Sequence, residues 1–142
     1  MTRKLVTKLS KRPCFTLTEK DTLKTASEKI QKHNVGVMPV LNETNKSVIG
    51  IISERDLARY ICKDEFKSNL SVSKIMSKNI ISCDLNTSVT QLMEIISSHK
   101  IRHVPIIEEK KLLGIVSIGD VVNHIIDQYK DENQQLRDFI NQ

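Results

Sequence analysis

The sequence has few aromatic residues: no tryptophan, two tyrosines and three phenylalanines. A hydrophobic core must therefore be built from isoleucine, valine and leucine, within a hydrophobic content of 39%. The scarcity of aromatic rings also argues against recognition of single-stranded nucleic acid, because such proteins stack bases on aromatic side chains.

Long hydrophobic runs are missing as well. No segment approaches the roughly 20 apolar residues that span a bilayer. The N-terminal stretch MTRKLVTKLSKRP is basic, but it lacks the apolar centre and cleavage site of a secretory signal. Three cysteines (Cys14, Cys62 and Cys83) form no CxxC pair and leave one thiol unpaired in any scheme, which is typical of a reducing compartment. We therefore expect a cytoplasmic protein, with Cys62 as a small buried hydrophobic residue.

Catalytic signatures are also missing. The sequence contains no G-x-S-x-G, P-loop or HExxH motif. His33 and His99 share a position near the end of a predicted helix, but no Cys, Asp or Glu accompanies them at the spacing of metal ligands. We therefore predict a protein that is not an enzyme and that has no metal or cofactor.

Charge leaves more than one role open. The chain has a formal net charge of +5 and a pI of about 9.2. Positive residues are densest near the N-terminus, at Arg3, Lys4, Lys8, Lys11 and Arg12. Such a distribution fits nucleic-acid binding, contacts to the phosphates of a small ligand, or simple solubility.

What the sequence does contain is an internal repeat. Pro39 in VMPVL and Pro105 in HVPII lie 66 positions apart, and after the prolines the offset falls to 64 because a polar loop is two residues shorter. The duplication predicts a first repeat over 1–66, a second over 67–130, and a helical extension over 131–142. The matched pairs include Val6 and Val72, Glu28 and Glu94, His33 and His99, Gly50 and Gly114, Ser53 and Ser117, and Asp56 and Asp120.

Each repeat shows the same pattern of elements. Apolar residues at helical spacing are followed by two short β-rich runs and then by a second helix that starts at Ser53 or Ser117. The first helices have Asp21, and Asn86 or Thr87, as candidate N-caps. We predict an α/β (α+β) fold of two small three-stranded sheets with helices, related by a pseudo-twofold axis, because each sheet needs its partner to cover its open face.

The segments GIISERDLAR (50–59) and GIVSIGDVVNHI (114–125) closely resemble the cystathionine β-synthase (CBS) domain, whose tandem pair is called a Bateman module. The resemblance runs from about Lys4 to Tyr129, and its motif G-h-h-S-x-x-D, where h is hydrophobic, occurs twice within the matched duplication. It implies a regulatory protein that binds an adenosine ligand such as AMP, ADP, ATP, S-adenosylmethionine or cyclic di-AMP between the repeats. It also implies signalling to an effector protein, which the sequence does not identify.

The repeated Asp residues suit ribose binding. Asp56 and Asp120 fall in the first turn of a helix, where the helix dipole stabilises a carboxylate that can accept hydrogen bonds from two vicinal hydroxyls. Ser53 and Ser117 offer a hydroxyl and a helix N-terminus to an anion. The alternative is a capping arrangement in which each Asp only reaches back to its own serine.

Phosphate contacts are expected mainly in the second repeat. By resemblance, Arg102 and His103 line the cleft beside the phosphates. An Arg offers a planar fork to phosphate oxygens, and a His can add a pH-dependent charge. A solvent-facing edge pair is the alternative. Arg55 is a further candidate at the first site. This distribution predicts that Asp120 contributes more to affinity than Asp56.

Adenine is expected between aliphatic walls, because no aromatic residue is available to stack on it. The resemblance places Thr16 and Ser82 beside the adenine or ribose, although both could equally be ordinary turn hydroxyls. The predicted lining of the base pocket comprises Gly36, Val37, Met38, Ile52, Ile101 and Val116.

The C-terminal segment continues the last helix with an apolar stripe that includes Val122, Ile126, Tyr129, Leu136 and Ile140. Such a stripe predicts an association surface, and we expect a homodimer, for which the family offers a disc-like pairing as precedent. Two alternatives to ligand sensing remain: a protein-interaction scaffold with degenerate clefts, and a nucleic-acid-associated regulator.

Overall fold

The computed structural model describes residues 3–142, so the first two residues of the predicted first repeat lie outside it. The first half contains α1 (Arg3–Leu9), β1 (Leu17–Thr18), α2 (Leu23–His33), β2 (Val37–Leu41), β3 (Val48–Ser53) and α3 (Glu54–Ile61). The second half contains the 3-10 turn η1 (Val72–Lys74), α4 (Val89–His99), β4 (His103–Glu108), β5 (Lys111–Ser117) and α5 (Ile118–Ile140). The predicted mixed fold and element order are confirmed.

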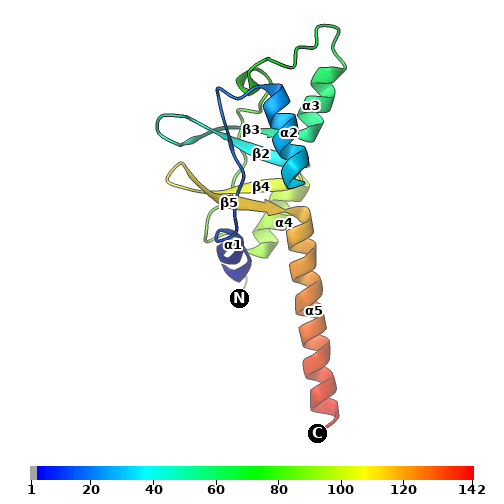
Figure 1. The fold of residues 1–142 in the computed structure, drawn as a ribbon. Coiled ribbons are helices and arrows are strands. Elements are labelled where there is room, and N and C mark those ends of the chain that lie inside the picture. Colours follow the sequence, from blue (N-terminus) through cyan, green and yellow to red (C-terminus); the bar gives the residue numbers. More distant parts are fainter. Residues whose placement is uncertain (1–2) are drawn as a thin grey trace.

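The two sheets lie one above the other, each with its helices beside it (Figure 1). In the first sheet, β2 lies between β1, which is parallel to it, and β3, which is antiparallel. The second sheet has only the antiparallel pair β4 and β5. The equivalent of β1 is reduced to one parallel bridge between Cys83 and Ile106, so the expected third strand is barely formed.

Helix boundaries differ slightly from the expected caps. Thr22 caps α2 by accepting a hydrogen bond from the Thr25 amide, and Ser88 caps α4 by accepting one from the Gln91 amide. The caps expected at Asp21 and at Asn86 or Thr87 are therefore wrong by one or two residues. A hydroxyl caps a helix from the position whose backbone leaves the helix, and sequence alone does not fix that position when polar residues are adjacent.

The first element of each half, α1 or η1, packs in the hydrophobic core of the other half. Leu5, Val6 and Leu9 of α1 belong to the core of the second half, together with residues such as Leu92 and Val116. Conversely, Val72 in η1 is buried in the core of the first half. Each repeat therefore completes the core of the other, which ties the two halves together.

Two glycines make room for this exchange. A Cβ atom on Gly114 would lie 2.9 Å from the carbonyl oxygen of Leu9, and one on Gly50 would lie 2.7 Å from Cγ of Met76. The repeated glycine of the motif thus allows the exchanged segment to approach the strand closely.

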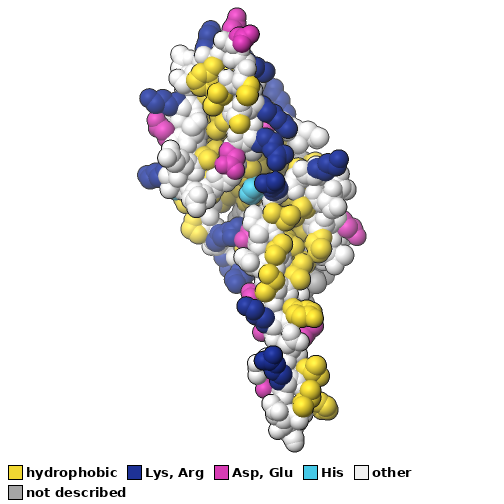
Figure 2. All heavy atoms as spheres, turned by 90° about the vertical axis from the view of Figure 1, so that its right-hand side faces the viewer, with side chains coloured by type: hydrophobic (Ala, Val, Ile, Leu, Met, Phe, Trp, Pro, Cys, Tyr) yellow, Lys and Arg dark blue, Asp and Glu magenta, His cyan; other side chains and the backbone are white. Residues whose placement is uncertain are grey.

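Helix α5 is the longest element and extends well beyond the rest of the molecule (Figure 1). Figure 2 shows apolar side chains along its protruding part. Within the described residues no helix is both long and apolar enough to cross a membrane.

Candidate functional site

Two cavities lie where the halves meet. The first has a volume of about 330 Å³, at the lower end of the range for small-molecule sites. Its wall combines the start of α3 with the segment that enters β4 and with part of the connection after η1. It is lined by Gly36, Val37, Ile51, Ser53, Glu54, Arg55, Asp56, Arg59, Ser77, Asn79, Ile81, Lys100, Ile101, Arg102, His103 and Pro105.

The second cavity has a volume of about 360 Å³ and uses the equivalent elements of the other repeat. The start of α5 and the segment before β2 form its wall, together with the connection between α1 and β1. It is lined by Arg12, Pro13, Cys14, Phe15, Asn34, Val35, Gly36, Val37, His103, Ile115, Ser117 and Asp120.

The two cavities share part of their walls. Gly36, Val37 and His103 line both of them. A Cβ atom on Gly36 would lie 3.1 Å from Cε1 of His103, so the imidazole packs directly on the glycine backbone. A change in the position of His103 would therefore alter both cavities.

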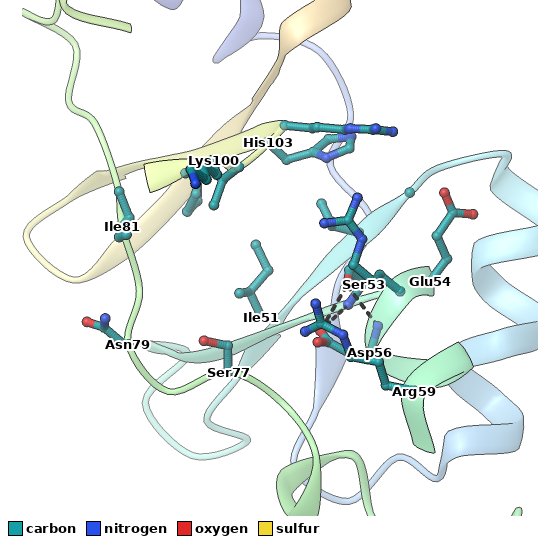
Figure 3. A pocket seen from close by; sticks show the side chains of 16 residues that line it. Ile51, Ser53, Glu54, Asp56, Arg59, Ser77, Asn79, Ile81, Lys100 and His103 are labelled. Carbon is teal, nitrogen blue, oxygen red and sulfur yellow. Dashed lines mark hydrogen bonds between the residues drawn. The ribbon is translucent and has the colours of Figure 1, made fainter. Parts of the chain in front are cut away.

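Asp56 forms a capping box and still presents one free oxygen. Its Oδ2 accepts hydrogen bonds from the Ser53 amide at 2.8 Å and from the Ser53 hydroxyl at 3.0 Å. Oδ1 accepts no hydrogen bond from any group in residues 3–142. In Figure 3, Ser53 and Asp56 lie at the start of α3, across the cavity from Lys100 and His103. The cap and a ligand contact are thus compatible at this position.

Asp120 forms the same capping box, with Oδ2 accepting from the Ser117 amide at 2.8 Å, but its carboxylate is also paired with Arg12. The guanidinium donates to Oδ1 at 3.0 Å and to Oδ2 at 2.8 Å, and it also donates to the carbonyl of Ile115 at 2.7 Å. Burial raises the pKa of Asp120, but the hydrogen bonds from Arg12 and Ser117 outweigh it, so the net pKa is lowered. The same pairing raises the pKa of Arg12.

Cationic side chains gather in the first cavity. Arg55, Arg59 and Arg102 line its wall, together with Lys100, and none of the three arginines forms an ion pair within the described part of the chain. Arg55 and Arg102 were predicted to contact phosphate. Arg102 and His103 were expected to serve mainly the second site, whereas Arg102 lines the cavity of Asp56.

Three basic residues of the two cavities were not predicted as site residues from the sequence: Arg59 and Lys100 in the first cavity and Arg12 in the second. Arg59 lies three positions after Asp56 and so shares its helix face, a signal that was available. Lys100 takes the left-handed conformation (φ 54°) of Asn34 (φ 52°), its equivalent in the first repeat. Arg12 gave no local signal, because it pairs with a residue 108 positions away.

The surroundings of His103 favour the neutral form of its imidazole. Burial lowers its pKa below the ordinary value of 6.5, while the charges of Asp120 and Glu54 oppose this effect and that of Arg102 adds to it. A neutral imidazole in the shared wall is suited to hydrogen bonding, and a nearby anion would favour its protonation.

Some predicted contact residues lie outside both cavity walls. Met38, Ile52 and Val116 are fully buried in the two cores. Side chains alternate along a strand, so Ile52 faces the core while its neighbour Ile51 faces the first cavity. Thr16 and Ser82 are also outside the walls, because the connections line the cavities with earlier residues such as Phe15 and Ile81.

The cysteines do not follow the prediction. Cys62 ends α3 and is exposed, so its expected burial is wrong. Cys83 is the buried one, and burial raises its pKa to about 12. Cys14 lines the second cavity, where burial raises its thiol pKa.

His33 stacks on Phe15 with ring centroids 3.6 Å apart, and no group of metal-binding side chains gathers within residues 3–142.

Comparison with known proteins identifies the fold and the repeat. The family described as the CBS domain matches residues 5–63 and again 72–127. A mitochondrial CBS domain-containing protein of Arabidopsis thaliana, CBSX3, is 33% identical over 127 residues, which are 87% of this chain and 62% of that protein. The chain thus spans less than two thirds of this relative.

Solved structures of CBS-domain proteins have the same fold as this chain. The CBS domain-containing protein ATU1752 from Agrobacterium tumefaciens is 34% identical, with a TM-score of 0.77 over 86% of this chain and 96% of that one. The CBS domain pair of the protein MJ0100, in complex with 5-methylthioadenosine and S-adenosyl-L-methionine, is 22% identical, with a TM-score of 0.77 over 87% of this chain and 96% of that one. With two matched domains facing each other across two cavities, this chain belongs to the CBS domain family.

Proposed function

We propose that this CBS domain pair is a regulatory module that binds an adenosine ligand bearing phosphate in the first cavity. Binding changes the shape of the pair or its choice of effector protein. The observation that carries the proposal is the combination, in one cavity, of the Asp56 carboxylate, whose Oδ1 accepts no hydrogen bond from residues 3–142, and three arginines that form no ion pair with these residues. We further expect the chain to act in the cytoplasm, as its three free cysteines suggest.

The carboxylate of Asp56 is suited to bind the ribose of the ligand. The two free lone-pair positions of Asp56 Oδ1 can accept hydrogen bonds from vicinal ribose hydroxyls, while Oδ2 keeps the cap in place. Hydrogen bonds to a charged acceptor contribute about 1.5–3 kcal/mol each. Val37, Ile51 and Ile101 supply the apolar wall for the base.

The three arginines of the first cavity are suited to bind the phosphate of the ligand. Their planar forks match phosphate oxygens, and Arg55 and Arg102 approach the cavity from opposite halves of the molecule. A bound phosphate would therefore link the two halves. Such a link is what a ligand needs in order to shift a conformational equilibrium, because it stabilises one arrangement of the halves over others.

The MJ0100 pair supports the choice of an adenosine ligand. That protein holds two adenosine derivatives in the same fold. Neither of its ligands carries phosphate, so the three arginines here are the reason for preferring AMP, ADP or ATP to S-adenosylmethionine, whose sulfonium is cationic.

Isothermal titration calorimetry with AMP, ATP, S-adenosylmethionine and cyclic di-AMP tests the proposal. We expect AMP or ATP to bind more tightly than S-adenosylmethionine, and Asp56→Asn to abolish most of the heat. An absence of binding by all four at millimolar concentration would favour the scaffold alternative. Binding to random duplex DNA with a steep salt dependence would instead favour the nucleic-acid alternative.

We also infer that a second copy of this chain covers the apolar stripe of α5. Ile118, Val122, Ile125, Tyr129, Leu136 and Phe139 are exposed, and together with Glu132 they follow the alternating 4-3 spacing of a coiled-coil seam. The residues flanking the seam in the protruding part, such as Gln128, Asn133 and Gln135, are uncharged. A seam without flanking charge does not repel an identical helix.

The seam favours an antiparallel pairing. Glu132 is its one charged member, and a parallel pair would place two Glu132 carboxylates side by side. An antiparallel pair instead places Glu132 opposite the hydroxyl of Tyr129, Ile125 opposite Leu136, and Val122 opposite Phe139. The interface is then self-complementary, as a twofold dimer requires.

Light scattering after size-exclusion chromatography tests this dimer. Leu136→Glu should yield monomers, whereas Gln134→Glu, on the outer face of the same turn, should remain dimeric. Oxidative cross-linking fixes the orientation: Ile125→Cys chains should cross-link to Leu136→Cys chains when mixed. Efficient cross-linking of Leu136→Cys chains to one another would indicate a parallel pair instead.

A further inference from the structure

Arg12 occupies the place in the second cavity where a ribose would be recognised. Its guanidinium forms a bidentate pair with Asp120, and its third hydrogen bond, to the carbonyl of Ile115, fixes the orientation of the fork. The Asp120 side chain is 18% exposed, so the pair is partly shielded from water. The first cavity has no such contact at Asp56 within the described residues.

The pairing leaves too few acceptor sites for a diol. A carboxylate has about four lone-pair positions. The Ser117 amide and Arg12 use both positions of Oδ2, and Arg12 uses one of Oδ1. Two vicinal hydroxyls need two acceptors, so a ribose at Asp120 requires Arg12 to move away.

The displaced guanidinium needs a new partner. Besides Asp120 and Arg12 itself, the titratable groups in the wall of the second cavity are His103 and Cys14, and neither supplies a negative charge near pH 7. The carboxylate of Glu54 lies near Gly36 in the shared wall, but it lines the first cavity. A ligand that brings its own anion supplies the partner, whereas a neutral nucleoside does not. The cost of moving Arg12 therefore depends on the charge of the ligand.

We propose that Arg12 gates the second cavity and makes it selective for adenosine ligands that carry a negative charge. The pair with Arg12 blocks the Asp120 carboxylate. A nucleotide draws the guanidinium to its phosphate and frees the carboxylate for the ribose. The proposal rests on the function proposed above. It assigns to the second cavity a ligand-binding residue, Arg12, and a preference for anionic ligands.

The repeat provides a matched control. Lys78 stands at the position equivalent to Arg12, 66 residues later, but it is exposed and lies outside the wall of the first cavity. Arg12→Gln and Lys78→Gln remove the same charge from equivalent positions. Only the first of these changes should alter ligand binding at the second cavity.

Cys14 reports directly on the second cavity, because it lies in the wall of that cavity alone. The experiment measures the alkylation rate of Cys14 at pH 8 by peptide mass spectrometry, in a Cys62→Ser background that removes the exposed thiol. Protection is titrated with adenosine and with AMP. Calorimetric stoichiometry, with and without Asp56→Asn, reports binding at the first cavity.

In the wild-type protein and in Lys78→Gln, AMP should protect Cys14 at concentrations at least about tenfold lower than adenosine, as expected for one charge-assisted contact. In Arg12→Gln, adenosine should protect about tenfold better than in the wild type, and the preference for AMP should fall below about threefold. Arg12→Lys keeps the charge without the fork and should give an intermediate preference. It also serves if the glutamine variant fails to fold.

Two results overturn the gate alone. One is equal protection by adenosine and AMP in the wild type while calorimetry shows ligand in the first cavity. The other is an unchanged preference in Arg12→Gln. Failure of both ligands to bind either cavity, in the wild type and in both Arg12 variants, overturns the proposed function and the gate with it.

Discussion

The two cavities are made from equivalent positions of a duplicated unit, yet they differ in charge. Both start from a serine and an aspartate in the same capping box. At Asp56 the carboxylate keeps a free oxygen among three arginines, whereas at Asp120 both oxygens are bound by Arg12. The same local motif therefore gives an open site in one repeat and a self-paired site in the other.

The difference comes from the residues around the shared serine and aspartate. Arg55 and Arg59 stand where the second repeat has Gly119 and Asn123, and Arg12 lies on the connection after α1. Each cavity also takes part of its wall from the connection that follows α1 or η1, and these connections differ: Arg12 to Phe15 line one cavity, and Ser77, Asn79 and Ile81 line the other. The duplication thus keeps the serine–aspartate cap, while the residues around the cap set the charge of each cavity.

The largest expected difference between the two cavities is measured by substituting the equivalent aspartates, Asp56 and Asp120. Asp56→Asn should weaken AMP binding about thirtyfold, because it removes a charged acceptor of ribose hydroxyls. Asp120→Asn should change total AMP affinity less than about threefold. Both variants keep a side-chain oxygen for the cap. Calorimetry measures the effect, and a larger loss for Asp120→Asn would restore the ranking expected from the sequence.

The cationic wall of the first cavity can be tested separately from the ribose contact. Arg102→Gln should weaken AMP binding about tenfold and leave adenosine binding unchanged, because only AMP offers a partner to the guanidinium. Arg137→Gln, far along α5, removes the same charge as a control. Equal losses for both ligands would mean that Arg102 supports the cavity structurally.

The shared wall predicts a smaller, pH-dependent effect. A phosphate near His103 would raise its lowered pKa, so AMP affinity should increase about threefold from pH 7.5 to pH 6.5. Adenosine affinity should stay flat over this range, and His103→Gln should remove the AMP effect. Imidazole titration by NMR, with and without AMP, measures the pKa directly. No shift on AMP binding would exclude a nearby phosphate.

The smallest expected effect concerns stability. The pKa of Asp120 is lowered in the folded state. Its pairing with Arg12 therefore stabilises the protein fully at pH values above the ordinary pKa of 3.8, and this contribution is lost as the pH falls through the folded pKa. Because Arg12 is 46% exposed, we expect only about 0.5 kcal/mol. Arg12→Gln should lower the melting temperature by about 1–2 °C at pH 7, with the difference disappearing near pH 2.

Much of the architecture followed from local sequence patterns. The repeated prolines and the G-h-h-S-x-x-D motif predicted both hairpins and the two capped helix starts, and residues such as Arg55 and Arg102 were predicted to line a cavity. The core positions of Met38 and Ile52 were harder to predict, because their strands carry apolar residues on both faces and period-two alternation is then invisible.

The sequence by itself determined the duplication, the order of elements and the serine–aspartate caps, because each depends on residues a few positions apart. Only the tertiary structure decided that α1 and η1 exchange cores, that Arg102 lines the same cavity as Asp56, and that Arg12 binds Asp120. These contacts join residues distant in the chain, and their partners are chosen by how the two halves pack and not by any local preference.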